Sequence, residues 1–373
     1  MRVSISYRNK PCLNCPLGSY VTETERARSS AVWLGLLVPS GRPVVSLETN
    51  TTLTAVPGIL VGHATLHAHL TGCTVILCPE GATAGVCIRG GAPGSRETDA
   101  LRPGTLTPSV HGLLLTGGSA FGLDAATGVV RYLVAQGIGF ETRHARIPIV
   151  PAAVIYDLGL GDAAVRPTAE DGYAAARAAT AGPVTEGCIG AGCGATAGKA
   201  LGMDRAVKSG LGSWAATAAD GTRVAALAVV NAFGEVTDPA TGRVLAGPRH
   251  HTGSGFAPTV EVMQGPATSP HATHMENTTL VVVATDAVLT KEHANALANM
   301  ADDGIARCVR PAHTQMDGDA VFALATGHRQ TSLSLSTLGA LAADCVTQAI
   351  VRAVQQATAA GGLPAARDLG GVA

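Results

Sequence analysis

The stretch Glu276-Asn277-Thr278-Thr279-Leu280-Val281-Val282-Val283-Ala284 decides how this chain folds and how it is interpreted. Its apolar and β-branched residues predict a buried strand over residues 278–285. A threonine with a free amine is both a nucleophile and a base. Cleavage between Asn277 and Thr278 would therefore convert a precursor into an amide hydrolase, provided that other residues supply the remaining catalytic roles. The alternative is a threonine that only opens a strand.

Asn277 favours the cleavage hypothesis. A short polar residue tolerates unusual backbone angles, and it can hold a strained peptide bond at the cleavage site. The preceding residues 247–274 are rich in Pro, Gly and His and lack a clear period, which is typical of an exposed linker.

Composition indicates a globular chain of 373 residues with one large α/β domain. The net charge is -1 and only 14% of residues are charged, so no basic surface points to nucleic acid or an anionic membrane. No apolar run approaches the roughly 18 residues of a membrane span. We therefore expect small molecules and copies of the same chain as partners. The 46 glycines and 3% aromatic residues predict close backbone packing between sheets and helices.

The nine cysteines are odd in number and lack the spacing of a small disulfide-bonded domain, so we expect free thiols and a cytoplasmic location. Cys12-x-x-Cys15 is a lone pair without a second pair of metal ligands. Residues 1–50 have little periodic pattern and are expected to be a disordered extension or the product of an upstream start codon. The predicted catalytic domain is residues 51–373.

Strands and helices alternate in blocks without a sustained βαβ rhythm. This pattern predicts stacked layers, with helices outside and sheets inside. Other strand-like segments are residues 53–61, 73–78, 84–88 and 224–230. Helical segments are residues 119–136 with Ser119 as N-cap, 169–181, a helix capped by Thr290 that ends before Pro311, and 336–357.

Lys199 and Asn231 are candidates for two further catalytic roles. Lys199 ends a Gly-rich loop that lacks the spacing of a phosphate-binding loop, since Cys193 replaces the first glycine and Ala200 the hydroxyl residue. Its charge can lower the pKa of a neighbouring hydroxyl or amine, although an exposed surface lysine fits the local sequence equally well. Asn231 ends the strand 224–230, where its amide can donate to an oxyanion or simply terminate the strand.

His313-Thr-Gln-Met-Asp317-Gly318-Asp319 is the most suggestive polar cluster. Two carboxylates flanking a glycine can converge on one cation, which would be a metal, Lys199 or the Thr278 ammonium. Asp317 and Asp319 lack the regular oxygen ligands of a calcium loop. The alternative is an ordinary Asp-Gly turn.

Two groups of histidines and one serine resemble other kinds of site without matching them. His63, His67 and His69, and His250-His251 with His271 and His274, lack a Cys or carboxylate at ligand spacing. No metal or other cofactor is therefore expected. Ser119 lacks the second glycine of a nucleophile elbow, and its expected role is helix capping or binding a substrate carbonyl or carboxylate.

Taken together, the segments resemble the L-aminopeptidase/D-esterase family, which includes β-aminopeptidases and nylon-oligomer endo-hydrolases. The resemblance spans roughly residues 53–368. The matching pieces are Gly90-Gly-Ala-Pro-Gly-Ser-Arg-Glu-Thr-Asp99, Leu115-Thr-Gly-Gly-Ser-Ala-Phe-Gly-Leu123, Val154-Ile-Tyr-Asp157, Ala197-Gly-Lys199, Val230-Asn231, Asn277-Thr278-Thr279 and Met316-Asp-Gly-Asp319.

The resemblance implies a four-layer αββα sandwich like that of the N-terminal-nucleophile hydrolases, with the connectivity shared by this family and the ornithine acetyltransferases. It also implies self-cleavage into residues 1–277 and 278–373, which stay together as a processed unit, and a homotetramer of such units. Several β-aminopeptidases use Ser as nucleophile, with Ser and Glu where this chain has Asp317 and Asp319. The match to the threonine subgroup implies a catalytic set of Thr278, Lys199, Asn231, Asp317 and Asp319.

The expected substrate is a small amide, a peptide or a nylon-type oligoamide, with Ser119 and Tyr156 lining its pocket. Two alternatives stay open. One is acyl transfer, as in the ornithine acetyltransferases, and the other is a non-catalytic small-molecule-binding protein with the same fold.

Overall fold

Strand β14 (Thr278–Ala287) is buried along its whole length, which confirms the predicted strand. Leu280 and Val282 contribute to one apolar cluster, whereas Val281 and Val283 contribute to another. Because successive side chains of a strand point to opposite faces, this alternation means that β14 is covered on both sides.

The computed structural model describes residues 50–251, 255–265 and 276–369. The expected extension before residue 50 and the Cys12/Cys15 pair lie outside these residues. So does much of the expected linker over residues 247–274. Its described part contains the short helix α3 (Thr259–Gln264).

Nine strands form one hydrogen-bonded sheet, in which eight follow the order β10-β11-β14-β16-β2-β4-β7-β3 and β1 pairs with β2 off this path. β14 pairs antiparallel with β11 and parallel with β16, so it lies inside the sheet. The remaining strands of this sheet are β1 (Leu60–Leu66), β2 (Thr71–Ile88), β3 (Ser95–Arg96), β4 (Val110–Thr116), β7 (Ala152–Val154), β10 (Leu211–Thr217), β11 (Arg223–Asn231) and β16 (Ala320–Arg329).

Strand β2 joins two layers. Its first half pairs with β1 and β4, and its second half pairs with β16. The prediction of separate strands over residues 73–78 and 84–88 was therefore wrong. The turn-forming residues Pro79–Gly81 lie at an irregularity inside one strand, where the register of pairing with β4 shifts between Leu77 and Ala82.

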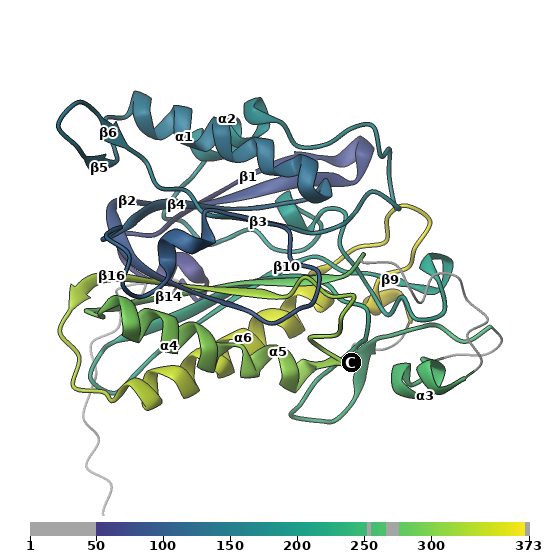
Figure 1. Cartoon of the computed structure of the whole chain (residues 1–373). Helices are drawn as coiled ribbons and strands as arrows, with labels where there is room; N and C mark the ends of the chain where they lie inside the picture. The colour runs from purple at the N-terminus through teal and green to yellow at the C-terminus, as the bar shows by residue number, and fades with distance from the viewer. Residues whose placement is uncertain (1–49, 252–254, 266–275, 370–373) are drawn as a thin grey trace, which may run out of the picture. The chain divides into compact units, whose positions relative to one another are not determined.

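Three apolar clusters separate four layers. One cluster lies between the two β-layers, the second between β11, β14, β16 and the helices α4 to α6, and the third between β2, β4 and the helices α1 and α2. Figure 1 shows α1 and α2 on one outer face and α4, α5 and α6 on the other. The chain thus has the predicted layered α/β fold, a four-layer αββα sandwich.

The helices correspond to the predicted segments, but α1 begins at Ala125 instead of residue 119, and the single helix predicted after Thr290 is divided at Asp302 into α4 and α5. They are α1 (Ala125–Ala135), α2 (Ala169–Arg177), α4 (Lys291–Ala301), α5 (Asp303–Cys308) and α6 (Leu335–Gln356). Thr290 caps α4 as predicted, since its side chain accepts a hydrogen bond from the His293 amide.

Two local predictions at the N-terminal half were wrong. Ser119 does not cap α1, because residues 119–124 form a 3-10 helix (η4) and Ser119 has a left-handed backbone with φ of 53°. The expected strand over residues 53–61 is a short 3-10 helix (Leu53–Ala55) followed by a loop, and β1 begins only at Leu60.

Smaller sheets complete the described fold and carry the loops around β11. Their strands are β5 (Phe140–Glu141), β6 (Arg146–Ile147), β8 (Thr196–Ala197), β9 (Val207–Lys208), β12 (Glu235–Thr237), β13 (Val244–Ala246) and β15 (Val309–Arg310). β8 leads directly into Lys199, and β15 leads into the His313–Asp319 cluster.

Helix α6 alone among the described helices is long and apolar enough to cross a membrane by length and composition. In the fold, however, 67% of its most apolar window is buried. Its side chains Leu338, Ala342 and Ile350 join the cluster beneath β11 and β14. It is therefore the core helix of one layer.

Candidate active site

Thr278 lies at the first position of β14, opposite Asn231 at the last position of β11. Its hydroxyl Oγ1 lies 2.5 Å from the carbonyl oxygen of Asn277. The Gly318 amide donates to the same oxygen at 2.8 Å. The peptide bond between Asn277 and Thr278 is therefore buried, with a hydroxyl and an amide donor against its carbonyl.

Lys199 reaches this point from the loop after β8. Its ammonium donates to the Asn231 carbonyl at 3.0 Å, to Asn231 Oδ1 at 2.9 Å and to the Glu276 carbonyl at 3.1 Å. Lys199 is 6% exposed, so it is not the surface lysine that the local sequence also allowed. Burial lowers its pKa to about 7, although the charges of Asp317 and Glu276 act in the opposite direction.

The Asn231 side chain is fully buried between two backbone carbonyls. Its Nδ2 donates to Tyr156 O at 2.9 Å and to Glu276 O at 3.1 Å. Its Oδ1 accepts from the Thr196 amide and from Lys199. These contacts identify which side-chain atom is the amide nitrogen, and they hold it toward the cleavage segment.

Asp317 and Asp319 flank Thr278 from the segment before β16. Asp319 Oδ1 accepts from the Thr279 amide at 2.6 Å, and Asp317 Oδ2 accepts from the Thr314 amide and hydroxyl. Both carboxylates are buried. Burial, reinforced by the negative charge of Asp319, raises the pKa of Asp317 to about 6. The two predicted aspartates therefore lie near Thr278, but they accept hydrogen bonds from different groups.

A cavity of about 270 Å³ opens at Thr278. Ser119 and Tyr156, which were expected to line a substrate pocket, are among the residues that line this cavity. Burial, with the negative charge of Glu276, raises the pKa of the Tyr156 phenol. The other lining residues come from the loop before β3, the start of η4 and the end of β7: Ala92, Pro93, Gly94, Ala120 and Val154.

Asp157 positions the Ser119 side of this cavity. Its carboxylate accepts from the Gly118 amide and from the Thr71 hydroxyl, each at 2.7 Å. A Cβ on Gly117 would lie 2.1 Å from Asp157 Oδ2, so only glycine fits there. This tight turn explains why Ser119 adopts a left-handed backbone instead of capping α1.

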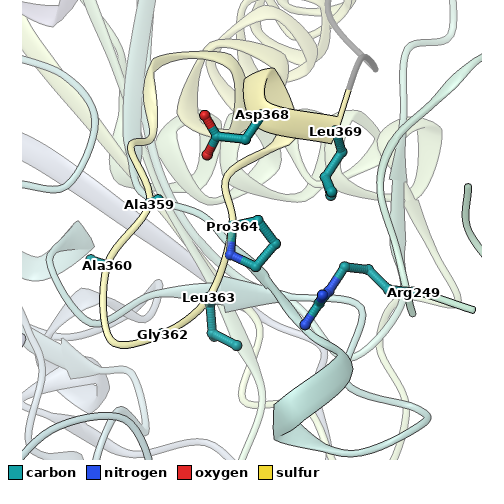
Figure 2. A pocket seen from close by; sticks show the side chains of 8 residues that line it. All are labelled: Arg249, Ala359, Ala360, Gly362, Leu363, Pro364, Asp368 and Leu369. Atoms are coloured by element: carbon teal, nitrogen blue, oxygen red, sulfur yellow. The ribbon is translucent and has the colours of Figure 1, made fainter. Parts of the chain in front are cut away.

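A larger cavity of about 670 Å³ lies elsewhere, between Arg249 and the turn from Ala359 to Leu369 (Figure 2). Its labelled lining residues include none of the five predicted catalytic residues. Cavity volume alone therefore does not identify the candidate active site.

The histidine groups do not form a metal centre among the residues that the structure describes. No group of three or more His, Cys, Asp or Glu side chains there is arranged to hold a metal ion. His63 contacts the Thr74 hydroxyl at 2.9 Å, and burial lowers its pKa to about 4. His271 and His274 lie outside the described residues.

The structure adds residues that sequence reasoning did not assign to the site. The Thr196 amide donates to Asn231, the Gly318 amide donates to the Asn277 carbonyl, and His313 lies between Asp319 and Asp302. His313 belongs to the polar cluster His313–Asp319 that was identified from the sequence, so its place in that cluster could have indicated a role in the site. Nothing in the sequence indicated that Asp302 belongs to the site, because an acidic residue between two helices is usually a surface residue.

Two facing sheets between helical layers, with a threonine at the start of a central strand, define a fold of the N-terminal-nucleophile hydrolase type. The fold of the L-aminopeptidase D-Ala-esterase/amidase of Ochrobactrum anthropi, described as a variant of that fold, is similar with a TM-score of 0.61. The two chains are 22% identical, with 83% of this chain and 86% of the other covered.

Residues 51–366 match peptidase family S58, and the chain belongs to this family of amide-bond hydrolases. It is 42% identical to an uncharacterized aminopeptidase of Mycobacterium tuberculosis over 85% of this chain and 97% of the relative. It is 31% identical to the 6-aminohexanoate-oligomer endohydrolase of Kocuria sp. over 84% of this chain and 88% of the relative. The family resemblance that the sequence motifs indicated is thereby confirmed.

Proposed function

We propose that this chain is a self-processing amide hydrolase whose nucleophile is Thr278. The observation that carries the proposal is the placement of the Thr278 hydroxyl 2.5 Å from the Asn277 carbonyl oxygen, to which the Gly318 amide also donates. A nucleophile and an oxyanion donor therefore meet at one peptide bond.

In the first step, Thr278 Oγ1 attacks the Asn277 carbonyl carbon. The C–N bond breaks, the hydroxyl proton passes to the released Thr278 amine, and an ester joins Asn277 to the threonine oxygen. Water then hydrolyses the ester and leaves an Asn277 carboxylate. The Gly318 amide is well placed to stabilise negative charge on the carbonyl oxygen during the attack.

Cleavage would free donors for a substrate. Asn231 Nδ2 and Lys199 Nζ each use one hydrogen for the Glu276 carbonyl, which belongs to the new C-terminal segment. Once that segment withdraws, Asn231 would donate to the oxyanion of a substrate amide. The free Thr278 amine would transfer the proton during acylation and deacylation, and Lys199, Asp317 and Asp319 would set the charge around it.

The substrate would occupy the cavity lined by Ser119 and Tyr156. Its volume of about 270 Å³ fits a small acyl group. We propose peptides and small oligoamides as substrates, because both kinds of activity appear in the names of relatives. The same reasoning favours hydrolysis over transfer to an acceptor such as ornithine.

We further propose a cytoplasmic location and a homotetramer of processed units. All seven described cysteines are free, and six of them are buried, which suits a reducing compartment. The tetramer follows from the family resemblance alone, and its direct test is the native mass of the purified protein.

Self-cleavage is tested by denaturing gel electrophoresis and intact mass of the purified chain. We expect two polypeptides with termini at Asn277 and Thr278, and a single polypeptide from Thr278→Ala. Thr278→Ser is the matched control, because it keeps the hydroxyl and should still cleave. An uncleaved wild-type chain would overturn the self-processing proposal.

Catalysis is tested on the cleaved protein with amino-acid p-nitroanilides, short peptides and 6-aminohexanoate oligomers. We expect hydrolysis of at least one class and covalent acylation of Thr278 visible by mass. Added ornithine separates the transferase alternative, since it would become acylated in preference to water. Release of acylated ornithine as the main product would contradict the hydrolase assignment.

A further inference from the structure

His313 lies half-buried between two carboxylates. Its Nδ1 lies 3.0 Å from Asp319 Oδ2, and its Nε2 lies 3.2 Å from Asp302 Oδ2. Asp302 and Asp319 are both almost fully buried. Two carboxylates that face one imidazole stabilise a positive charge on the ring much more than they stabilise the neutral ring. The arrangement therefore favours the charged form.

The backbone of His313 is held as tightly as its side chain. Its φ of 57° lies in the left-handed region, which a non-glycine residue adopts only when its surroundings compensate. The compensation comes from Asp319, whose Oδ2 accepts from the His313 amide at 3.0 Å and also faces the ring nitrogen Nδ1. One oxygen of the Asp319 carboxylate thus contacts both the backbone amide and the ring of His313.

This contact continues to the nucleophile. The other oxygen of Asp319 accepts from the Thr279 amide at 2.6 Å, one residue after Thr278. Polar contacts therefore run continuously from Asp302, at the junction of α4 and α5, through His313 and Asp319 to Thr279 at the start of β14. The mechanism proposed above does not use Asp302 or His313.

We propose that His313, held as an imidazolium between Asp302 and Asp319, is a positioning residue that fixes the Asp319 carboxylate as the acceptor of the Thr279 amide and places a positive charge beside the aspartate pair. The inference rests on the proposed function for its catalytic consequence.

The charges around His313 agree with this assignment. Burial by itself would lower the pKa of His313, but the hydrogen bonds and charges of Asp302 and Asp319 outweigh burial and raise it to about 9. Arg89, at the end of β2, also lies 3.6 Å from Asp302 Oδ2, and its side chain is 54% exposed. Asp317, Lys199, Glu276 and Tyr156 are further titratable groups on the Thr278 side, and Cys87 lies near Asp302 and Arg89.

The first test measures the charge of His313 without using activity. Histidine-labelled full-length protein is titrated by NMR, with the His313 signal assigned by its loss in His313→Asn. Asparagine tolerates the left-handed backbone, so this variant removes the ring with little backbone strain. We expect His313 to stay protonated through pH 8 and its pKa to fall by at least one unit in Asp302→Asn. The exposed neighbour Asp303 supplies the matched control Asp303→Asn, which should change nothing.

The second test measures the acidic limb of kcat/KM against pH on the p-nitroanilide or oligoamide that the wild type hydrolyses. His313→Asn removes the imidazolium charge, which makes ionisation of Asp317 harder. The limb should therefore move to higher pH by on the order of one unit in His313→Asn. Asp302→Asn removes a negative charge while His313 stays protonated in this pH range, so its limb should not move to higher pH. A purely structural role would lower activity at every pH without moving the limb.

The outcomes separate the two proposals. Ordinary titration of His313 near neutral pH in the wild type would overturn the inference. So would an unmoved limb in His313→Asn when the wild-type His313 titrates as expected. A wild-type chain that neither cleaves itself nor hydrolyses amides would overturn the proposed function and the catalytic consequence drawn from it. The NMR titration would then still decide whether the Asp302–His313–Asp319 chain carries the charge.

Discussion

Lys199 is the residue whose chemistry depends most on burial. Its three hydrogen-bond acceptors are Asn231 O, Asn231 Oδ1 and Glu276 O, none of which carries a full charge. An ammonium surrounded by neutral oxygens loses hydration without gaining a directly bonded counter-ion. This is why its pKa falls so far below the ordinary value.

The shift predicts a specific pH dependence of stability. Between about pH 7 and 10 the unfolded chain binds a proton at Lys199 that the folded chain does not, so folding is favoured increasingly as pH rises. Relative to Lys199→Met, stability should therefore increase by about 2 kcal/mol from pH 7 to pH 9. Urea unfolding of both proteins in the uncleaved Thr278→Ala background measures the difference. A pH-independent difference would show that Lys199 is not titrating in this range.

Gly318 contributes through both its amide and its missing side chain. A Cβ at this position would lie 2.9 Å from Thr278 Oγ1 and 2.8 Å from the Ala92 carbonyl oxygen. Gly318→Ala should displace the hydroxyl from the Asn277 carbonyl and slow self-cleavage by on the order of 10-fold or more. The fraction of cleaved chain against time after synthesis measures this. Gly182→Ala, where only Thr180 Oγ1 lies near, is the control and should cleave at the wild-type rate.

Among the elements, β10 and α6 approach each other at backbone distance. A Cβ on Gly212 in β10 would lie 2.2 Å from the Ala349 carbonyl oxygen of α6. Gly85 in β2 has a similar relation to α4, at 2.3 Å from the backbone of Ala294. The glycine-rich, aromatic-poor composition thus corresponds to helices that lie directly on strands, as predicted.

Gly212→Ala should separate β10 from α6 and destabilise the fold by about 1 to 3 kcal/mol, because a packed interface has no room for an added methyl group. Equilibrium urea unfolding provides the measurement. Gly182→Ala is again the matched substitution, with little expected change. Equal stability of the two variants would mean that α6 shifts without cost.

At the scale of the whole molecule, the segment after the cleavage site is built into the sheet. β14 lies between β11 and β16, and the segment after it supplies α4 and α6, which cover that sheet. β11 belongs to the part of the chain before the cleavage site. Each fragment would expose a large apolar surface without the other.

We therefore expect residues 1–277 and 278–373 to stay associated after cleavage. Size-exclusion chromatography without denaturant should give one species containing both polypeptides, at the same elution volume as uncleaved Thr278→Ala. Separation should require enough denaturant to unfold the sheet. Spontaneous dissociation in buffer would contradict the packing argument.

Local sequence was sufficient for the central strand, the main helices and the layered class. The run from Leu280 to Ala284 is apolar on both faces, and Thr290 carries the signal of a helix cap, so neighbouring residues decide both features. The same kind of local signal gave a wrong prediction at Pro79–Gly81, where turn residues suggested a break between two strands but mark an irregularity within β2. It also gave a wrong prediction at Ser119, which follows a glycine turn held by the distant Asp157.

The family motifs supported the hypothesis that Lys199, Asn231, Asp317 and Asp319 share a site with Thr278. The residue types alone did not establish that these side chains lie in contact. The sequence by itself determined which chemical groups are present, the central strand from Thr278 and the main helical segments. Only the tertiary structure decided that Asn231 lies opposite Thr278, and that Asp302 reaches Asp319 through His313. The physical reason is that strand register and layer packing create these contacts between segments far apart in the chain, and such contacts leave no periodic signal.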